Sequence, residues 1–192
     1  LDDHVIVVLG DVMGKKWGAW FFSFNFLSYI RSAIRLCVFD GISSPASILN
    51  KINRIVCLDP VLGDVLSTLS LMMIDKSASK VYYAGAGDLP IIHFKKTGGE
   101  ITCVQSEGLL LGVLENGLYK EDVLDMHPGD QVVAITDGMI DFMGENGKTS
   151  DYTLFVQKLG RLLGQTDTYK EIKNEMFSDN EDESVVDDRS LV

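Results

Sequence analysis

The chain has few basic residues for its length. Among 192 residues, 17 lysines and arginines stand against 28 aspartates and glutamates, and the formal net charge at pH 7 is -11. Binding to nucleic acid or to an anionic membrane surface needs a basic face. The composition therefore argues against both partners. Clustered acids, by contrast, can hold divalent cations.

Cysteine and histidine are also scarce, with three of each. Cys37, Cys57 and Cys103 are odd in number and have no short spacing, which predicts neither a disulfide framework nor a zinc site. A reducing, cytoplasmic setting fits best. The opening "LDDHV" has no initiator methionine and no signal peptide. We therefore expect a piece of a longer protein.

Residues 17–39 form the most apolar stretch and have the length of a membrane span. Arg31 and Arg35 interrupt it, and an arginine near mid-membrane costs roughly 2.5 to 3.5 kcal/mol. A buried helix is the better interpretation, and no membrane span is expected. Helical spacing predicts its buried stripe, which comprises Phe22, Phe26, Tyr29 and Ala33.

The start of this helix is aromatic on nearly every side. Its bulky residues cover the whole circumference, so they cannot all face one core. We expect some to contact a second copy of the chain or an upstream regulatory helix. The residues concerned are Trp17, Trp20, Phe21, Phe22 and Phe24.

The remaining pattern is one helix, a run of short strands, two helices and a last strand. Strands that follow one another without intervening helices indicate an antiparallel meander. The order predicts an α+β sandwich in a single domain spanning 1–192. Strands are expected at 4–9, 65–75, 80–86, 89–96, 118–126, 130–137 and 189–192, and helices at 17–39, 43–59, 152–164 and 166–177.

Three predicted core strands end or begin with aspartate: Asp11 in "VVLGDVMGK", Asp137 in "VVAITDG", and Asp187 with Asp188 in "VVDDRSLV". An isolated Asp-Gly is usually a turn, and Asp130 is expected to be only that. If the three strands are neighbours, however, their carboxylates converge and repel one another unless a cation is bound. Oxygen ligands without histidine or cysteine favour Mg²⁺ or Mn²⁺. Two such ions suit phosphoester hydrolysis.

The motifs resemble, in residue and order, the PPM-type metal-dependent Ser/Thr protein phosphatases. The most similar branch is the stage II sporulation E-like (SpoIIE) group, which includes phosphatases that regulate sigma factors. The resemblance rests on "GDVMGK" (10–15), "AGAGDLP" (84–90), "GLLLGV" (108–113), "PGDQVVAITDGMIDFMGENG" (128–147) and "DDRSLV" (187–192).

This resemblance implies an α-β-β-α sandwich of two antiparallel sheets flanked by helices. It also implies hydrolysis of phosphoserine or phosphothreonine by a metal-activated hydroxide, without a covalent intermediate on a side chain. The implied substrate is a phosphorylated anti-sigma-factor antagonist of the STAS type in a bacterial signalling pathway. The domain would be the C-terminal part of a longer regulatory protein with an upstream sensor domain.

The resemblance further implies a role for each matching residue. Asp11 would bridge two Mn²⁺ or Mg²⁺ ions, and Val12 would offer its backbone carbonyl. Asp137 would be a ligand from the second sheet, and Asp187 the other ligand of the second metal. Asp188 would have a supporting role.

Four further positions match the motifs. Asp88 and Asp141 fall where the wider family can hold a third metal. Alternatively, Asp88 is a turn residue ahead of Pro90, and Asp141 an acid at a helix start, favoured by the helix dipole. Gly10 and Gly138 would be supporting backbone, with Gly138 letting the chain pass close behind the metal.

Two departures from the pattern keep other functions open. The first departure is that Lys16 and Trp17 stand where relatives have glycine and small residues. Lys16 would be strained if this position needs a positive φ; alternatively, its side chain attracts a phosphate or is simply solvated. In the family a further strand pair with an acidic segment precedes this motif, but only nine residues precede Gly10 here, so we expect that pair to be missing from this piece. A phosphatase-like sensor or binding module without turnover is therefore the alternative. A two-metal phosphodiesterase or nuclease fits the acidic charge less well.

Overall fold

The structure is a computed structural model that describes residues 3–13, 17–60, 62, 65–144, 147–166, 168–178 and 188–192. For residues 17–21, 142–144, 147–150 and 178 it describes the backbone alone. The chain forms two compact units, one of residues 1–88 with 105–126 and the other of residues 89–104 with 127–192.

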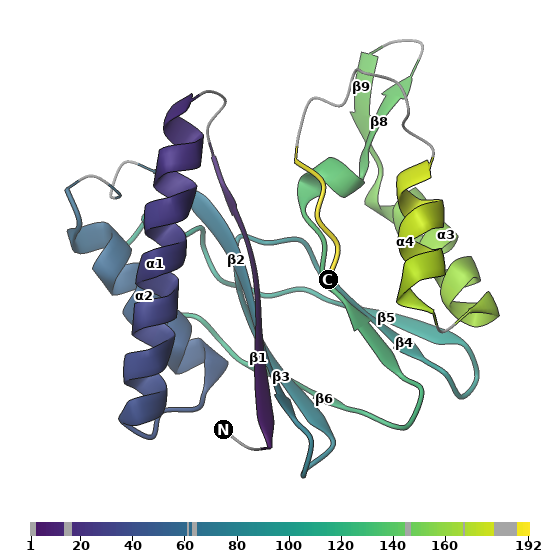
Figure 1. Ribbon diagram of the computed structural model, residues 1–192, viewed down its shortest axis with the longest axis horizontal. Helices are drawn as coiled ribbons and strands as arrows, with labels where there is room; N and C mark the ends of the chain where they lie inside the picture. Colours follow the sequence, from purple (N-terminus) through teal and green to yellow (C-terminus); the bar gives the residue numbers. More distant parts are fainter. Residues whose placement is uncertain are drawn as a thin grey trace. The chain divides into compact units, whose positions relative to one another are not determined.

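The first unit is built on a four-stranded antiparallel sheet in the order β1-β2-β3-β6 (Figure 1). In its register, Gly10 lies opposite Leu69 and Leu69 opposite Ala86. β1 is an edge strand and only half-buried, whereas the sequence predicts a buried strand there. The strands are β1 (His4–Val12), β2 (Ser67–Asp75), β3 (Lys80–Ala86) and β6 (Asp122–Asp125).

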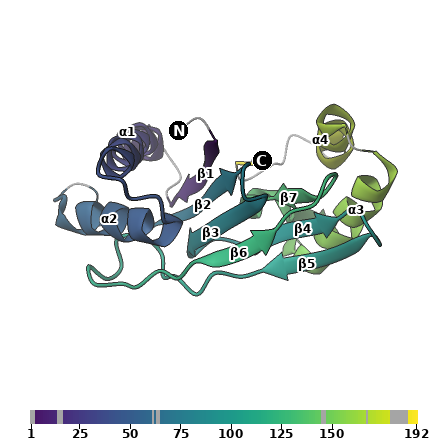
Figure 2. The same ribbon diagram turned by 90° about the horizontal axis from the view of Figure 1, so that it is seen from below.

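Helices α1 (Trp17–Phe39) and α2 (Pro45–Leu58) cover one face of this sheet (Figure 2). Pro45 begins α2 and the Ser44 hydroxyl caps it, accepting from the backbone N–H of Ser47 at 3.3 Å. The buried stripe of α1 differs from the prediction. It comprises Phe26, Ile30, Ala33 and Cys37.

Tyr29 does not belong to that stripe. A helix turns by about 100° per residue, so Tyr29 lies beside the face that Ile30 and Phe26 share. Its hydroxyl donates instead to the Asp59 carboxylate at 2.8 Å, on the exposed side of the helix. Phe22 is half-buried and packs against the core, so not all of the initial aromatic residues form a contact surface.

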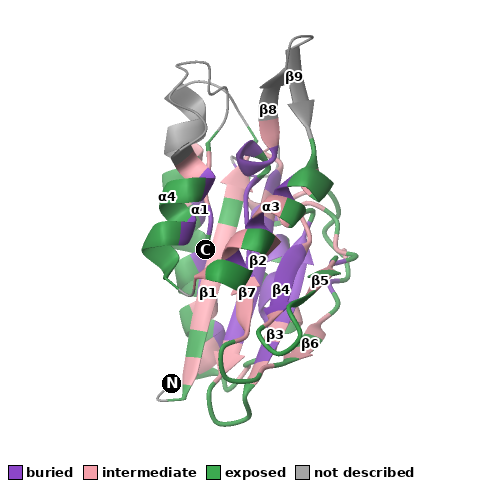
Figure 3. Ribbon diagram, turned by 90° about the vertical axis from the view of Figure 1, so that its right-hand side faces the viewer, coloured by how far each residue is buried: buried purple, intermediate pink, exposed green. Residues whose placement is uncertain are grey.

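The second unit contains a three-stranded antiparallel sheet, β5-β4-β7, packed against α3 and α4. β4 is buried along almost its whole length (Figure 3). A short helix, η1, follows β7, and a β8–β9 hairpin precedes α3. The elements are β4 (Ile91–Lys95), β5 (Glu100–Val104), β7 (Gln131–Val133), η1 (Asp137–Met139), β8 (Asp141–Gly144), β9 (Gly147–Ser150), α3 (Tyr152–Gln165) and α4 (Tyr169–Ser178).

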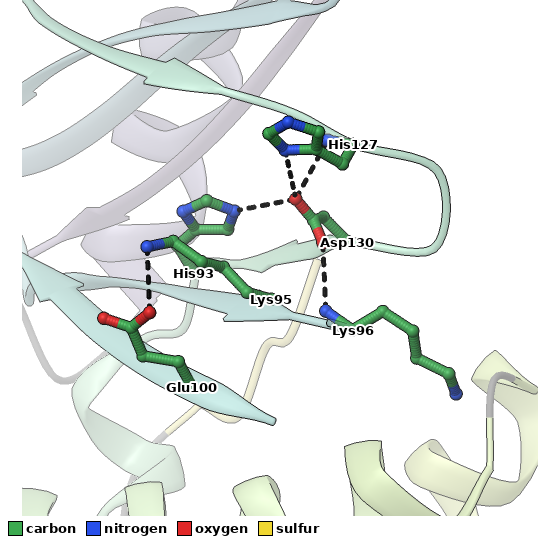
Figure 4. A network of polar contacts seen from close by, with 6 residues as sticks. All are labelled: His93, Lys95, Lys96, Glu100, His127 and Asp130. Atoms are coloured by element: carbon green, nitrogen blue, oxygen red, sulfur yellow. Dashed lines mark hydrogen bonds and ion pairs between the residues drawn. The ribbon is translucent and has the colours of Figure 1, made fainter. Parts of the chain in front are cut away.

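Asp130, a predicted turn residue, has a side chain that links two turns of this unit (Figure 4). Its side chain is only 2 % exposed and accepts from the backbone N–H groups of His127 and Lys96, both at 2.9 Å. Burial alone would raise the pKa of Asp130, but these hydrogen bonds and the nearby His93 and His127 rings outweigh it and lower the pKa. Asp130 therefore joins two turns, one of them distant in sequence.

Antiparallel sheets flanked by helix pairs are thus present in both units, as the α+β prediction requires. Within the described part of the chain, no helix is long and apolar enough to cross a membrane. The three cysteines are free thiols, in agreement with the expectation from their spacing.

Candidate metal centre

The first half of the predicted site lies at the end of β1. Gly10 allows β1 to approach β2 closely, because a Cβ there would lie 2.8 Å from Leu69 Cδ1 and 3.1 Å from the Thr68 carbonyl oxygen. Asp11 is half-buried, and its backbone N–H donates to Thr68 Oγ1 at 3.3 Å. Val12 packs on the core beneath α1 and α2. Since successive side chains alternate, Asp11 lies on the opposite face of the sheet.

Asp88 follows β3 at the same end of the sheet as Asp11, because their strands are in register there. Its carboxylate turns back over the sheet. Oδ2 accepts from the Ser70 hydroxyl and from the Tyr83 hydroxyl, the latter at 2.7 Å. Ser70 and Tyr83 project on the same face as Asp11. A Cβ on Gly85 would lie 2.0 Å from Asp88 Oδ1, so a larger residue there would displace the carboxylate from this position.

The other carboxylate oxygen of Asp88, Oδ1, is buried and has no hydrogen-bond partner. Burial raises the pKa of Asp88, and the hydroxyls of Ser70 and Tyr83 oppose that rise by donating to the charged form. A buried carboxylate oxygen without a partner is costly. Either a proton or a nearby cation would lower that cost, so Asp88 fits a supporting place at a metal centre.

The second half of the site lies where the segment after β7 meets the C-terminal residues. Ala134 and Val192 exchange backbone hydrogen bonds of 2.9 and 3.0 Å, and Ile135 forms an antiparallel bridge with Leu191. Residues 133–136 are buried, and Asp137 is the first exposed residue after them. The Asp137 carboxylate therefore lies at the surface, directly after a buried segment.

Thr136 fixes the geometry of this junction. Its backbone N–H donates to the Ser190 carbonyl at 3.1 Å, and its hydroxyl donates to the Asp188 carbonyl at 3.1 Å while accepting from the Ser190 N–H at 2.9 Å. Thr136 was not predicted to be a functional residue, although it lies in the "ITDG" motif. The hydroxyl satisfies two backbone groups that the single bridge leaves unpaired.

Gly138 brings Asp137 and Asp188 side by side. A Cβ on Gly138 would lie 2.3 Å from the Asp188 carbonyl oxygen, a distance that no side chain tolerates. The close neighbour of Gly138 is thus the backbone of Asp188, while its predicted place behind a metal stays a prediction. Asp187 lies outside the described residues. Asp141 begins β8 opposite Ser150, so its interpretation as an acid at a helix start is wrong.

The candidate ligands of each unit, taken separately, have oxygen donors. Asp11 and Asp88 belong to the first unit, and Asp137, Asp141 and Asp188 to the second. Carboxylates and backbone carbonyls are the ligands that Mg²⁺ and Mn²⁺ prefer. Within either described half, no group of three or more histidine, cysteine, aspartate or glutamate side chains is arranged to hold a metal by itself. Lys16 lies outside the described residues.

A comparison with protein families shows which family the chain belongs to. Residues 1–192 match the family described as Stage II sporulation protein E (SpoIIE). The chain belongs to this family.

Among curated proteins, this SpoIIE domain is similar to the phosphoserine phosphatase RsbU of Bacillus subtilis. The two are 25% identical over 145 residues, and the match covers 76% of the chain and 42% of RsbU. It is 27% identical over 161 residues to protein IcfG of Synechocystis sp., covering 73% and 25% of the two chains. The SpoIIE domain thus spans less than half the length of these relatives.

Solved structures establish the fold of the SpoIIE domain. The SiaA-PP2C domain of Pseudomonas aeruginosa superposes with a TM-score of 0.82 at 18% identity, covering 100% of this chain and 75% of that one. The PP2C phosphatase domain of SpoIIE from Bacillus subtilis, with a fragment of its regulatory domain, gives a TM-score of 0.74 at 17% identity, covering 98% and 53%. The predicted PPM fold class is therefore confirmed.

Replacing Gly138 by alanine tests the packing against Asp188. The added methyl must displace the Asp188 backbone, and we expect a loss of about 1–3 kcal/mol in the free energy of unfolding, as for overpacked sites. Urea denaturation followed by circular dichroism measures it. Gly164→Ala is the matched control, since a Cβ there meets nothing within 4 Å. In helix α3 it should raise stability by roughly 0.8–1 kcal/mol. Equal stability of Gly138→Ala and the parent chain would contradict the described contact.

The raised pKa of Asp88 predicts a pH dependence of stability in the metal-free chain. In the unfolded chain Asp88 loses its proton near its ordinary pKa of about 3.9, whereas the folded chain retains the proton to higher pH. The contribution of Asp88 to stability is therefore complete below that pH and is lost as pH rises through the folded pKa.

Asp88→Asn should remove this decline, because its amide oxygen still accepts from the Ser70 and Tyr83 hydroxyls but does not ionise. Urea unfolding at a series of pH values above 4 would reveal the difference. Asp125→Asn, at a carboxylate that is 77% exposed, controls for the loss of one negative charge. An unchanged pH profile in Asp88→Asn would contradict the burial of this carboxyl group.

Proposed function

We propose that this domain is a metal-dependent phosphatase that hydrolyses phosphoserine or phosphothreonine on a protein. The observation that carries the proposal is the junction at which Gly138 sets Asp137 against the backbone of Asp188. It joins two of the three aspartate motifs within a chain of the SpoIIE family. The name of RsbU, a phosphoserine phosphatase, supports the same activity.

In this proposal two Mn²⁺ or Mg²⁺ ions are held by Asp11, Asp137 and Asp187, with the Val12 carbonyl. Asp88, Asp141 and Asp188 lend support or hold a third ion. RsbX, a structural neighbour with a TM-score of 0.69 and 17% identity, has been crystallised in complex with magnesium. Bound cations would supply an activated water and neutralise charge on the phosphate. The part of the protein is to hold the carboxylates in place through Thr136, Gly138 and Gly10.

Asp137→Asn tests the catalytic part of this proposal. The exposed carboxylate follows a buried strand, so removing its charge should leave the fold intact while abolishing Mn²⁺-dependent hydrolysis of p-nitrophenyl phosphate. Circular dichroism reports on the fold, and a chelator added to the parent chain reports on metal dependence. Turnover in Asp137→Asn within a few-fold of the parent chain would refute the assignment.

The proposed substrate is a folded partner, an anti-sigma-factor antagonist of the STAS type. The acidic chain, with a net charge of -11, disfavours a strongly anionic phosphosite and favours one flanked by neutral or basic residues. Docking would use surfaces away from the carboxylates, including residues 150–177, which carry no catalytic motif. A longer protein with an upstream sensor domain fits the length of the curated relatives.

To test the substrate, the Mn²⁺-loaded domain is given the phosphorylated antagonist and, separately, a phosphoserine peptide of the same local sequence. We expect the folded protein to be dephosphorylated with the higher kcat/KM, because only it offers the docking surface. Equal efficiency on the peptide, or turnover of a nucleotide alone, would contradict this choice of substrate.

The second candidate is a phosphatase-like sensor or binding module without turnover. The specific observation in its favour is the departure from the family pattern at Lys16 and Trp17. Metal binding without hydrolysis of either substrate would support it. Either function could use the exposed face of α1 to contact an upstream helix or a second copy, since Phe24 and Leu27 are 65% and 43% exposed there.

A further inference from the structure

We infer that Arg189 is a positioning residue that couples helix α4 to the aspartate junction at Asp137 and Asp188. Arg189 follows Asp188 directly and is half-buried. Its side chain reaches α4, while its stem and backbone belong to the junction. The inference deepens the proposed function, because it names a residue that would tune the metal centre from outside.

The contact with α4 is made at the end of that helix. Arg189 Nη2 donates to the Met176 carbonyl at 2.9 Å, and the guanidinium carbon lies 4.9 Å from the centroid of the Phe177 ring. α4 ends at Ser178, so the Met176 carbonyl is among the last four, which lack partners within a helix. The last turn of α4 contains no basic residue of its own. Arg189 therefore supplies the positive charge that a helix C-terminus favours, from a position 13 residues later in the sequence.

The contact with the junction is made at the other end of the side chain. Arg189 Cγ lies 3.3 Å from the position that a Cβ on Gly138 would occupy. On either side of Arg189, the Asp188 carbonyl and the Ser190 N–H are both bonded to the Thr136 hydroxyl. The backbone of Arg189 is thus held between two hydrogen bonds, directly behind the residue that follows Asp137.

These contacts make one continuous connection from α4 to the aspartates. α4 also buries Ile172 and Met176, which are 4% and 5% exposed, and its Tyr169 hydroxyl donates to the Leu191 carbonyl at 3.4 Å, so the arginine is one of several attachments of this helix to its unit. Because packed groups transmit displacement rather than absorb it, a change in the position of α4 would move the Asp188 backbone. Arg189 acts through that backbone and is not expected to contact substrate.

Arg189→Met keeps the aliphatic stem and removes the charge and the hydrogen-bond donor. We expect faster amide hydrogen exchange in the metal-free chain both in α4 (169–178) and in residues 188–192, since the connection serves both. We also expect the Mn²⁺ concentration for half-maximal activity to rise by about tenfold, the lower end of what residues behind metal ligands contribute. kcat at saturating Mn²⁺ should change little, which a general loss of folded protein would not produce.

Arg54→Met is the matched control, because this exposed arginine of α2 pairs with Glu115 at 3.8 Å and lies in the other unit. Arg189→Lys should recover part of the metal affinity, since a lysine can still donate to Met176 but does not stack as a planar group. Should Arg189→Met fail to fold, Phe177→Leu removes the aromatic partner and keeps the arginine. It is expected to raise exchange at residues 188–192 as well.

Exchange that rises in α4 alone, with unchanged metal affinity, would overturn the inference, because Arg189 would then be only a helix cap. The two proposals fail separately. If the parent chain shows no turnover, the proposed activity is wrong, but exchange at 188–192 and calorimetric Mn²⁺ binding still decide the role of Arg189.

Discussion

The close approach of the Gly138 backbone to the Asp188 carbonyl is the constraint on which the second half of the candidate site depends. A hydrogen atom in place of a side chain lets two chain segments 50 residues apart lie in direct contact. Thr136 then pairs the backbone groups of the terminal segment that this contact brings within reach.

The first half of the site follows the same principle with different residues. Glycines at positions 10 and 85 remove side chains where β1 approaches Leu69 and where the Asp88 carboxylate turns back over the sheet. The space at Gly85 allows an acid to be buried against two hydroxyls. Burial of the Asp88 carboxylate costs free energy and raises its pKa. A proton or a nearby cation would lower that cost.

Much of the architecture was predictable because it depends on local patterns. The bounds of α1 and β3 agree with the sequence prediction to the residue, whereas α2 begins at Pro45, two residues later than predicted. β5 was not predicted, because it follows a Gly-Gly turn and has only five residues. The β8–β9 hairpin was not predicted either, because its two short strands end and begin with glycine, at Gly144 and Gly147. Tyr29 was misplaced because an aromatic residue one position from the buried stripe of a helix resembles a member of it.

The sequence by itself determined the chemistry available to this protein. The amino-acid sequence itself contains the acids at strand ends, the family motifs and the glycines beside them. These features suffice to predict oxygen ligands and membership of the SpoIIE family. Tertiary structure alone decided that Thr136 bonds to Ser190 and Asp188, that Asp130 is buried between two turns, and that Arg189 reaches the end of α4. Each of these contacts joins residues that are distant in the chain, and their formation depends on how strands and helices pack, which local propensity and spacing do not specify.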